Sequence, residues 1–431
     1  MTATDLDEFT AEAIAWLDAN AKRVDDNADA PVFVWGEGEL DVAVFHAFEH
    51  EEEAAYMARI AEWNQRKAEQ GYHAITWPTE YGGLGLGRAH ARAFGKLARG
   101  YEHPGGHELF GVTTNLVAQT VRAFGTDEQK LEWLPMLLRA DQFCCQLFSE
   151  PGAGSDLAGL SCRATRDGDE WVLNGQKVWS SGAQFSDWGL LIARTDPDVV
   201  KHKGLTAFVI PMGVDGIEVR PIKQMSGGQS FGEVFFSDAH IHDRYRLGPV
   251  GEGWKVAMTT LGFERDHSSD GSGGGGTGGA SWTKLLATAQ VMGVTDDPVM
   301  RDELAKVYIH TRVESLLNRR AADLARSGTP GPEGSLGKIF WTQGMRVMSD
   351  AVSKVLGPRL IADSGEWGTY AWGEQVLGAP GYRIAGGSDE IQRNIIGERV
   401  LGLPGEPRTD KGPWKDVPRC GAGGHSEFTM W

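Results

Sequence analysis

Apolar residues recur at helical spacing through the first 140 residues of the chain. Leu6, Phe9, Ala13 and Leu17 repeat every three or four positions, which predicts an amphipathic helix over residues 5–20. A long, charged helix is predicted for residues 49–70, and helical periodicity resumes from about 88 to 138. The Pro- and Gly-containing stretch that begins at Tyr72 interrupts this pattern and predicts a loop.

The pattern changes at Phe143, where short runs rich in Val, Ile, Trp and Phe alternate with Gly, Asp and Asn. The clearest strand-like runs are residues 170–179, 188–194, 205–211, 217–222 and 232–236. Asn174-Gly175 is a typical hairpin-turn dipeptide. Several short strands at this spacing predict an antiparallel barrel or sandwich of about 100 residues.

Helical spacing returns after Gly253. It predicts helices over residues 254–265, 281–290, 298–327, 334–356 and 388–400, with a Gly-rich run at 271–279 that we expect to be a flexible loop. The predicted fold is an α+β multidomain protein. Its parts are an N-terminal helical domain (1–141), a middle antiparallel β-barrel (142–247), a C-terminal four-helix-bundle domain (248–405) and an irregular tail (406–431).

Composition narrows the class of protein. The formal net charge of −17 argues against a general nucleic-acid or anionic-membrane binder. No apolar run approaches the roughly 18 residues of a spanning helix, and the acidic N-terminus does not resemble a signal peptide. We therefore expect a cytoplasmic enzyme that binds neither nucleic acid nor membrane. The four cysteines have no metal or disulfide spacing, so we expect no metal site and reduced, buried thiols: Cys144, Cys145, Cys162 and Cys420.

Three segments carry potential chemistry. In QLFSEPGAGSDLAG (146–159), glycines allow backbone N–H groups to approach a ligand and Ser149 and Ser155 add hydroxyls. Alone, this is a weak phosphate-binding signal, and a tight turn explains it equally well. In NGQKVWSS (174–181), a strand Trp followed by two serines can form an aromatic wall and polar contacts for a flat ring, although a core Trp is the usual alternative.

The third segment, residues 384–404, includes GGSDEIQR (386–393). Ser388 is in the position of a helix N-cap. The free N–H groups and positive end of the helix dipole would suit a phosphate or ribose.

Together these segments resemble the acyl-CoA dehydrogenase family. Its signatures TEPxAGSD, NGxKxWI(T/S) and (E/G)G(T/S)xEIQRxxI have counterparts in SEPGAGSD (149–156), NGQKVWSS and GGSDEIQR, in the family's order. The WPTEYGG loop (77–83) is also family-like, and the resemblance covers roughly residues 1 to 405. It implies an FAD-dependent dehydrogenase that desaturates an acyl-CoA thioester and passes electrons to an electron-transfer flavoprotein.

The resemblance also implies roles for individual residues. Gln146, Phe148 and Ser149 would line the flavin, with Ser149 near its redox-active nitrogen, and Trp179 would shield a ring face. Ser155 would contact the phosphates of FAD or the CoA chain. Arg265 would contact the substrate. Ser388 and Glu390 would lie by the adenosine end, and Gly357 would approach the dinucleotide of a neighbouring subunit. The implied cofactor residues are Gln146, Phe148, Ser149, Ser155, Trp179, Ser181, Gly357, Ser388 and Glu390.

The expected catalytic base is Glu264. Many family members carry the base just before the C-terminal motif, where this chain has Gly386. Other members, including isovaleryl, long-chain and actinobacterial steroid side-chain types, carry it on an earlier LxxER helix, which corresponds to LGFER (261–265). Burial by substrate would raise the pKa of such a carboxylate toward its working range.

A second departure concerns assembly. The Arg-x-x-Phe segment that reaches an adjacent subunit's FAD in many members is absent near the Gly-rich run. The resemblance therefore leaves open a homotetramer and an α2β2 heterotetramer in which a partner chain completes the FAD site. It also leaves open an acyl-CoA oxidase, a flavin monooxygenase or nitroalkane oxidase, and a non-catalytic acyl-CoA-binding subunit. Branched, bulky or steroidal acyl groups are compatible with a base on the earlier helix.

Overall fold

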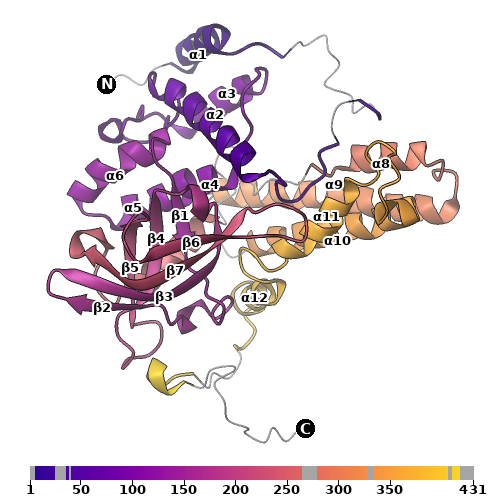
Figure 1. The fold of residues 1–431 in the computed structure, drawn as a ribbon. Coiled ribbons are helices and arrows are strands. Elements are labelled where there is room, and N and C mark those ends of the chain that lie inside the picture. Colours follow the sequence, from indigo (N-terminus) through magenta and orange to yellow (C-terminus); the bar gives the residue numbers. More distant parts are fainter. Residues whose placement is uncertain are drawn as a thin grey trace, which may run out of the picture.

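The computed structural model describes residues 5–24, 35–37, 40–264, 279–327, 334–405 and 410–417. Figure 1 shows helices at the start of the chain, a β-sheet in its middle, and a second group of helices that follows. The predicted helix–sheet–helix order is therefore confirmed. No helix within these ranges is long and apolar enough to cross a lipid bilayer.

The N-terminal helices closely follow the apolar periodicity. α6 begins with a capping box. The Thr126 hydroxyl accepts from the backbone N–H of Gln129, and Oε1 of Gln129 accepts from the backbone N–H of Thr126. Its apolar face buries Trp133 completely among residues of α5 and the sheet. The helices are α1 (Leu6–Asn20), α2 (His50–Ala68), α3 (Arg88–Ala98), α4 (Glu108–Gly111), α5 (Ala118–Phe124) and α6 (Asp127–Arg139).

The middle sheet is mostly antiparallel and has the strand order β6-β7-β3-β2-β4-β5-β8, with β1 paired to β4. It departs from the predicted antiparallel arrangement where β1 and, at one position, β2 run parallel to β4. Parallel pairing needs a long connection, which the chain between β1 and β4 supplies. The strands are β1 (Cys144–Leu147), β2 (Arg163–Asp167), β3 (Glu170–Ser181), β4 (Trp188–Arg194), β5 (Leu205–Pro211), β6 (Ile217–Ile222), β7 (Phe231–His242) and β8 (Arg246–Leu247).

The turn predicted at Asn174-Gly175 is wrong, because both residues lie inside β3. The pairing with β7 shifts register between Leu173 and Gly175, and Gly175 has φ +143°. A Cβ on Gly175 would lie 2.7 Å from Cα of Cys162, so the glycine permits close approach of the neighbouring strand. The dipeptide therefore marks a β-bulge rather than a hairpin.

The C-terminal helices match the prediction for α9 and α10, and α7, α8 and α12 with the turn that continues it to Val400 lie within one residue of the predicted ranges. α11 was not predicted, because its three internal glycines and Pro380 weaken the sequence signal. Burial of Trp372, whose Nε1 donates to Oγ1 of Thr288 at 3.1 Å, anchors it to α8. The helices are α7 (Gly253–Glu264), α8 (Trp282–Val291), α9 (Pro298–Ser327), α10 (Gly334–Leu356), α11 (Trp372–Tyr382) and α12 (Asp389–Ile395).

The three cysteines among the described residues are free thiols in the buried core. Burial raises the pKa of Cys145 to about 12 and that of Cys162 to about 11. These thiols therefore stay protonated near neutral pH, and a protonated thiol is a poor nucleophile. Cys420 lies outside the described residues.

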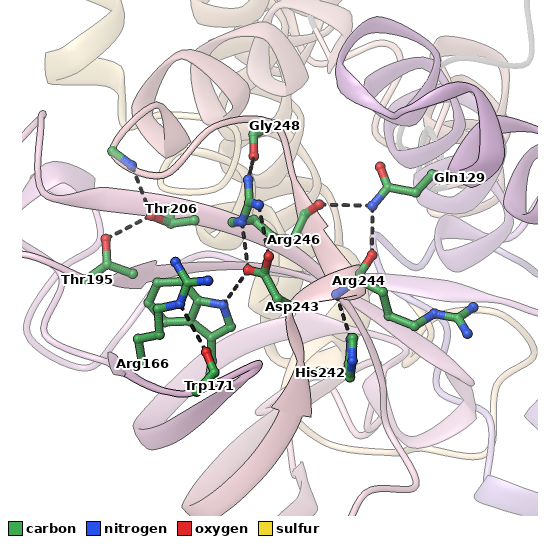
Figure 2. A network of polar contacts seen from close by, with 12 residues as sticks. Gln129, Arg166, Trp171, Thr195, Thr206, His242, Asp243, Arg244, Arg246 and Gly248 are labelled. Atoms are coloured by element: carbon green, nitrogen blue, oxygen red, sulfur yellow. Dashed lines mark hydrogen bonds and ion pairs between the residues drawn. The ribbon is translucent and has the colours of Figure 1, made fainter.

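A polar network joins the N-terminal helices to the end of the sheet, just before α7 (Figure 2). Nε2 of Gln129 on α6 donates to the carbonyls of Arg244 and Arg246 at 2.8 and 2.9 Å. The Asp243 carboxylate accepts two bonds from Arg246 and one from Nε1 of Trp171 on β3. The segment that leads into α7 is thus tied to both the first helices and the sheet.

Substitution of Asp243 tests this junction. Asp243→Asn keeps the shape but weakens bonds to a charged donor, so we expect a loss of about 1–3 kcal/mol of unfolding free energy. Urea denaturation followed by tryptophan fluorescence measures it. Glu218→Gln, in an exposed pair with Arg220, is the control and should change the midpoint little. Equal effects of the two substitutions would contradict the importance of the network.

The pH dependence has a defined sign. The hydrogen bond from Arg246 is the main cause that lowers the pKa of Asp243 to about 2 from its ordinary 3.8. The carboxylate therefore stabilises the folded state above pH 3.8, and this contribution is lost as the pH falls toward 2. The difference in unfolding free energy between the wild type and Asp243→Asn, measured by urea denaturation, should therefore shrink as the pH falls from 3.8 toward 2.

Candidate functional site

The segment SEPGAGSD (149–156) leaves β1 and lies directly against β3. The backbone N–H of Val178 donates to the carbonyl of Ser149 at 2.9 Å, and Nζ of Lys177 donates to the carbonyl of Phe148 at 2.9 Å. Gln146 lies in β1 itself. The structure therefore brings together the first two segments that the sequence singled out.

A buried ion pair fixes this contact. Nζ of Lys177 lies 2.9 Å from Oε1 of Glu150, with the Lys177 side chain 0% and the Glu150 side chain 5% exposed. The same carboxylate accepts from the backbone N–H groups of Ser161 and Cys162 at 2.6 and 2.8 Å. Burial alone would raise the pKa of Glu150, but Lys177 and these donors outweigh it and hold the pKa below its ordinary value.

Trp179 is presented outward from β3 in an uncommon conformation. Its φ is +61°, in the left-handed region, and its side chain is 58% exposed although it is a large aromatic. The next residue, Ser180, has a buried hydroxyl with no hydrogen-bond partner among the described residues. A strained backbone, an exposed indole and an unpaired hydroxyl at adjacent positions are the features of a ligand-facing strand.

Ser181 points to a carboxylate that the sequence analysis did not identify. Its hydroxyl donates to Oε1 of Glu108, at the start of α4, at 2.8 Å. Burial raises the pKa of Glu108, although the bond from Ser181 opposes the shift. Beside it, Nε2 of His107 lies 2.9 Å from Oε1 of the buried Glu53. Nδ1 of His107 accepts from the backbone of Leu109, so Nε2 carries the proton that bonds to Glu53.

Two glycines of the loop leave space that the chain itself does not fill. A Cβ on Gly152 or Gly154 would meet no atom within 4 Å, and neighbouring Ser155 is exposed. Internal packing therefore does not explain these glycines. The open space would let an external group, such as the diphosphate of a dinucleotide or of CoA, approach the backbone closely. Together with Trp179 and Ser180, the donor set fits a flavin nucleotide.

The remaining predicted cofactor residues lie in the C-terminal helices. Ser388 is the predicted N-cap, and its hydroxyl accepts from the backbone of Ile391 at 3.3 Å. Glu390 is exposed, and Gly357 is exposed with φ +54° and no atom within 4 Å of an added Cβ. Among the described residues, no hydrogen bond joins these three to the loop or to β3.

A run of aromatic rings connects the two regions instead. Trp179 meets Phe231 edge-on with ring centroids 6.1 Å apart, and Phe231 meets Phe45 at 5.4 Å. Phe45 in turn stacks on Tyr382 of α11 at 4.8 Å. The exposed face of β3 is therefore held beside the helical bundle through side-chain packing.

Glu264 is the last residue of α7, which packs against α5 and β5. The hydroxyls of Thr260 and Thr120 meet at 2.9 Å and fix this packing. The side chain of Glu264, Arg265, and the Gly-rich run except Gly279 lie outside the described residues. At the alternative base position, Gly386 has φ +64°, a conformation that favours glycine.

Sequence reasoning missed the roles of Glu150, Lys177 and Glu108. The first two stand inside the recognised motifs, and a lysine within an otherwise buried strand pattern was the available signal. Glu108 gave no such signal, because only the fold brings α4 against the end of β3.

Three family models match the chain in sequence order: the acyl-CoA dehydrogenase N-terminal domain at residues 41–141, the middle domain at 145–239 and the C-terminal domain at 251–401. An acyl-CoA dehydrogenase named IpdE1 from Mycobacterium tuberculosis is 36% identical over 405 residues, covering 94% of this chain and 99% of that protein. The chain belongs to the acyl-CoA dehydrogenase family. It is therefore an oxidoreductase.

Solved structures of acyl-CoA dehydrogenases have the same fold. A steroid acyl-CoA dehydrogenase, Tcur3481-Tcur3483, superimposes with a TM-score of 0.70 at 26% identity, covering 93% of this chain and 98% of that one. The ChsE4-ChsE5 complex from Mycobacterium tuberculosis gives 0.66 at 26% identity, covering 94% and 99%. The names of both of these proteins contain two components.

Removal of one partner of the buried pair tests how the loop is held. Glu150→Gln leaves the Lys177 ammonium buried without a carboxylate, so we expect a loss of about 3–5 kcal/mol of unfolding free energy. Urea denaturation gives the value. The control is Glu102→Gln, which disrupts an exposed pair with Lys22 and should alter stability little. A Glu150→Gln protein as stable as the control would refute the assigned role of the pair.

Proposed function

We propose that this acyl-CoA dehydrogenase binds FAD and introduces an α,β double bond into an acyl-CoA thioester, with Glu264 as the base. The observation that carries the proposal is the contact between SEPGAGSD and β3: the strand bears the exposed Trp179 and the unpaired Ser180, and the loop bears glycines open to a ligand. Bound FAD would supply a two-electron acceptor for the β-hydrogen.

Different residues of this chain would contact different parts of FAD. Gln146, Phe148, Ser149 and Ser181 would line the flavin, and Trp179 would cover one of its faces. Ser155 would donate to a phosphate of FAD or of the CoA chain. Ser388 and Glu390 would lie by the adenosine, and Gly357 by the cofactor of a neighbouring subunit.

Glu264 would take the proton from the substrate α-carbon, and that carboxylate would hold it as the β-hydrogen leaves with its electron pair. The end of α7 supports this role because the other common position of the base is Gly386, which has no side chain. Arg265, next in the chain, would contact the substrate. The two electrons would then pass to an electron-transfer flavoprotein; direct transfer to oxygen would make the protein an oxidase.

The relatives also support a substrate class. Similarity to a protein named as a steroid acyl-CoA dehydrogenase supports a bulky acyl group, such as a steroid side chain, in this chain as well. We further propose that the protein acts in the cytoplasm.

Glu264→Gln tests the base. The variant should retain FAD but lose substrate-driven flavin reduction by about two to four orders of magnitude, because a positioned base contributes factors of that size. Anaerobic stopped-flow bleaching measures it, using a panel of short, long, branched and steroidal CoA thioesters. Glu252→Gln, at an exposed carboxylate just before α7, is the matched control and should reduce normally. Normal reduction in Glu264→Gln excludes this residue as base, and a yellow wild type that no thioester bleaches contradicts the proposed reaction.

The same family likeness supports a tetramer, either of identical chains or of an α2β2 type. Ile309, Val313 and Leu316 lie on one face of α9 and are 60%, 36% and 57% exposed. Apolar side chains at this helical spacing favour burial against another chain.

Substitution on α9 tests the assembly. Ile309→Asp with Leu316→Asp should lower the molar mass in light scattering, whereas Ser315→Asp on the same helix should not. An unchanged mass would exclude this face as the interface. The flavin content of the wild type distinguishes the two assemblies: one FAD per chain supports the homotetramer, and colour only after addition of a second chain type supports α2β2.

A further inference from the structure

The last described segment of the chain, residues 410–417, returns to the middle sheet and packs on the residues that end and follow SEPGAGSD (149–156). We propose that this C-terminal strap is a positioning element that holds residues 156–160 and thereby sets the affinity of SEPGAGSD for a diphosphate group. The inference rests on the proposed role of the loop in binding FAD or CoA. In Figure 1 the yellow segment lies beside the sheet, apart from the orange helices that precede it.

The central contact comes from Trp414. Its Nε1 donates to the carbonyl of Gly159 at 3.1 Å, and its ring faces the Arg194 guanidinium at 4.5 Å from the centroid. Gly159 ends the short turn that directly follows SEPGAGSD. The indole therefore contacts both the loop and the cation beneath it.

Arg194 is 2% exposed, and its guanidinium donates to the backbone carbonyls of Ala158, Leu160 and Lys201. Nη2 donates to the carbonyls of Ala158 and Leu160 at 2.6 and 3.1 Å. Together with Trp414, it satisfies three consecutive carbonyls at residues 158–160. The guanidinium donates in its own plane, and the indole covers its face.

An ammonium joins the strap to the loop a second time. Nζ of Lys201 pairs with Asp156, the last residue of SEPGAGSD, at 2.6 Å and also with Asp410 of the strap. The Lys201 side chain is 6% exposed, so this charge is largely removed from water. The Asp156 carboxylate is 60% exposed and that of Asp410 20%, so the pair with Asp410 is the better shielded from salt of the two.

Backbone contacts align the strap with the connection between β4 and β5. The N–H of Trp414 donates to the carbonyl of Val199 at 2.8 Å, and that of Lys415 donates to the carbonyl of Pro197 at 3.1 Å. Val200 and Pro413 form a β-bridge. The strap is therefore seated by main-chain pairing, and this pairing sets the position of the Trp414 ring.

The opposite end of the loop is held without the strap, by Glu150 and Lys177. Between these two anchors, Gly152, Gly154 and Ser155 remain exposed. Backbone donors bind a diphosphate well only if they are already arranged before it arrives. Loss of the strap should consequently weaken binding while the base and the flavin-facing strand are unchanged.

The experiment compares Trp414→Ala, Trp414→Phe and Lys415→Ala in the full chain. Trp414→Ala removes both the indole N–H and the ring over Arg194. Trp414→Phe restores the ring alone. Lys415→Ala is the matched control: Lys415 lies on the same strap, and the substitution breaks only its exposed pair with Asp198 of the connection between β4 and β5. Three quantities are measured: amide hydrogen exchange at residues 157–160, the dissociation constants of FAD and of coenzyme A, and the steady-state constants for an acyl-CoA substrate.

We expect amide exchange at 157–160 to be about tenfold faster in Trp414→Ala, and the dissociation constant of FAD or coenzyme A to rise about five- to tenfold. Whichever constant rises identifies the diphosphate that the loop holds. KM should rise if that ligand is CoA, with kcat at saturating FAD unchanged. Trp414→Phe should recover part of the loss, and Lys415→Ala should match the wild type.

Unchanged exchange and unchanged dissociation constants in Trp414→Ala would overturn the inference. A fall in kcat with unaltered binding would also overturn it, because it would indicate a role in the chemistry rather than in positioning. If the wild-type chain binds neither FAD nor coenzyme A, the proposed function fails. Exchange at 157–160 then still decides whether the strap holds this segment.

Discussion

The arrangement of the site depends on the buried pair between Glu150 and Lys177. A fully buried ammonium is stable only with a compensating charge and hydrogen bonds, and the Glu150 carboxylate and the Phe148 carbonyl supply both. Because the carboxylate comes from the loop and the ammonium from β3, satisfying the charge forces the two segments together. In a regular strand Trp179, two residues beyond Lys177, would share its buried face; the register shift between Lys177 and Ser180 and the positive φ of Trp179 turn the indole outward instead.

Periodicity predicted those elements whose apolar residues face a single core. The bounds of α9 and α10 follow this rule, since each presents a regular apolar stripe to the helical bundle. α11 does not follow it: glycines and Pro380 lower its intrinsic helix preference, and burial of Trp372 outweighs that preference. Asn174-Gly175 failed for a related reason, because local turn preference yields to the long pairing of β3 with β7.

For the site, the sequence predicted the segments but not the contacts between them. The glycines and serines of SEPGAGSD are recognisable in the chain because their chemistry is local. The roles of Glu108 and Trp414 depend on contacts that form only on folding. α4 approaches β3, and the strap approaches the end of the loop, each from a distant part of the sequence. Long-range polar contacts of this kind have no spacing rule that a single sequence could reveal.

The two anchors of the loop are chemically complementary. On one side a carboxylate collects N–H donors at residues 161 and 162, and on the other Arg194 and Trp414 donate to the carbonyls of residues 158–160. The backbone groups of this exit segment are therefore used internally and are not open to a ligand. The N–H of Ala153 bonds back to the Glu150 carbonyl. Groups open to an anion are consequently confined to the short stretch around Gly152, Gly154 and Ser155, where an added Cβ on either glycine would meet no other atom of the chain.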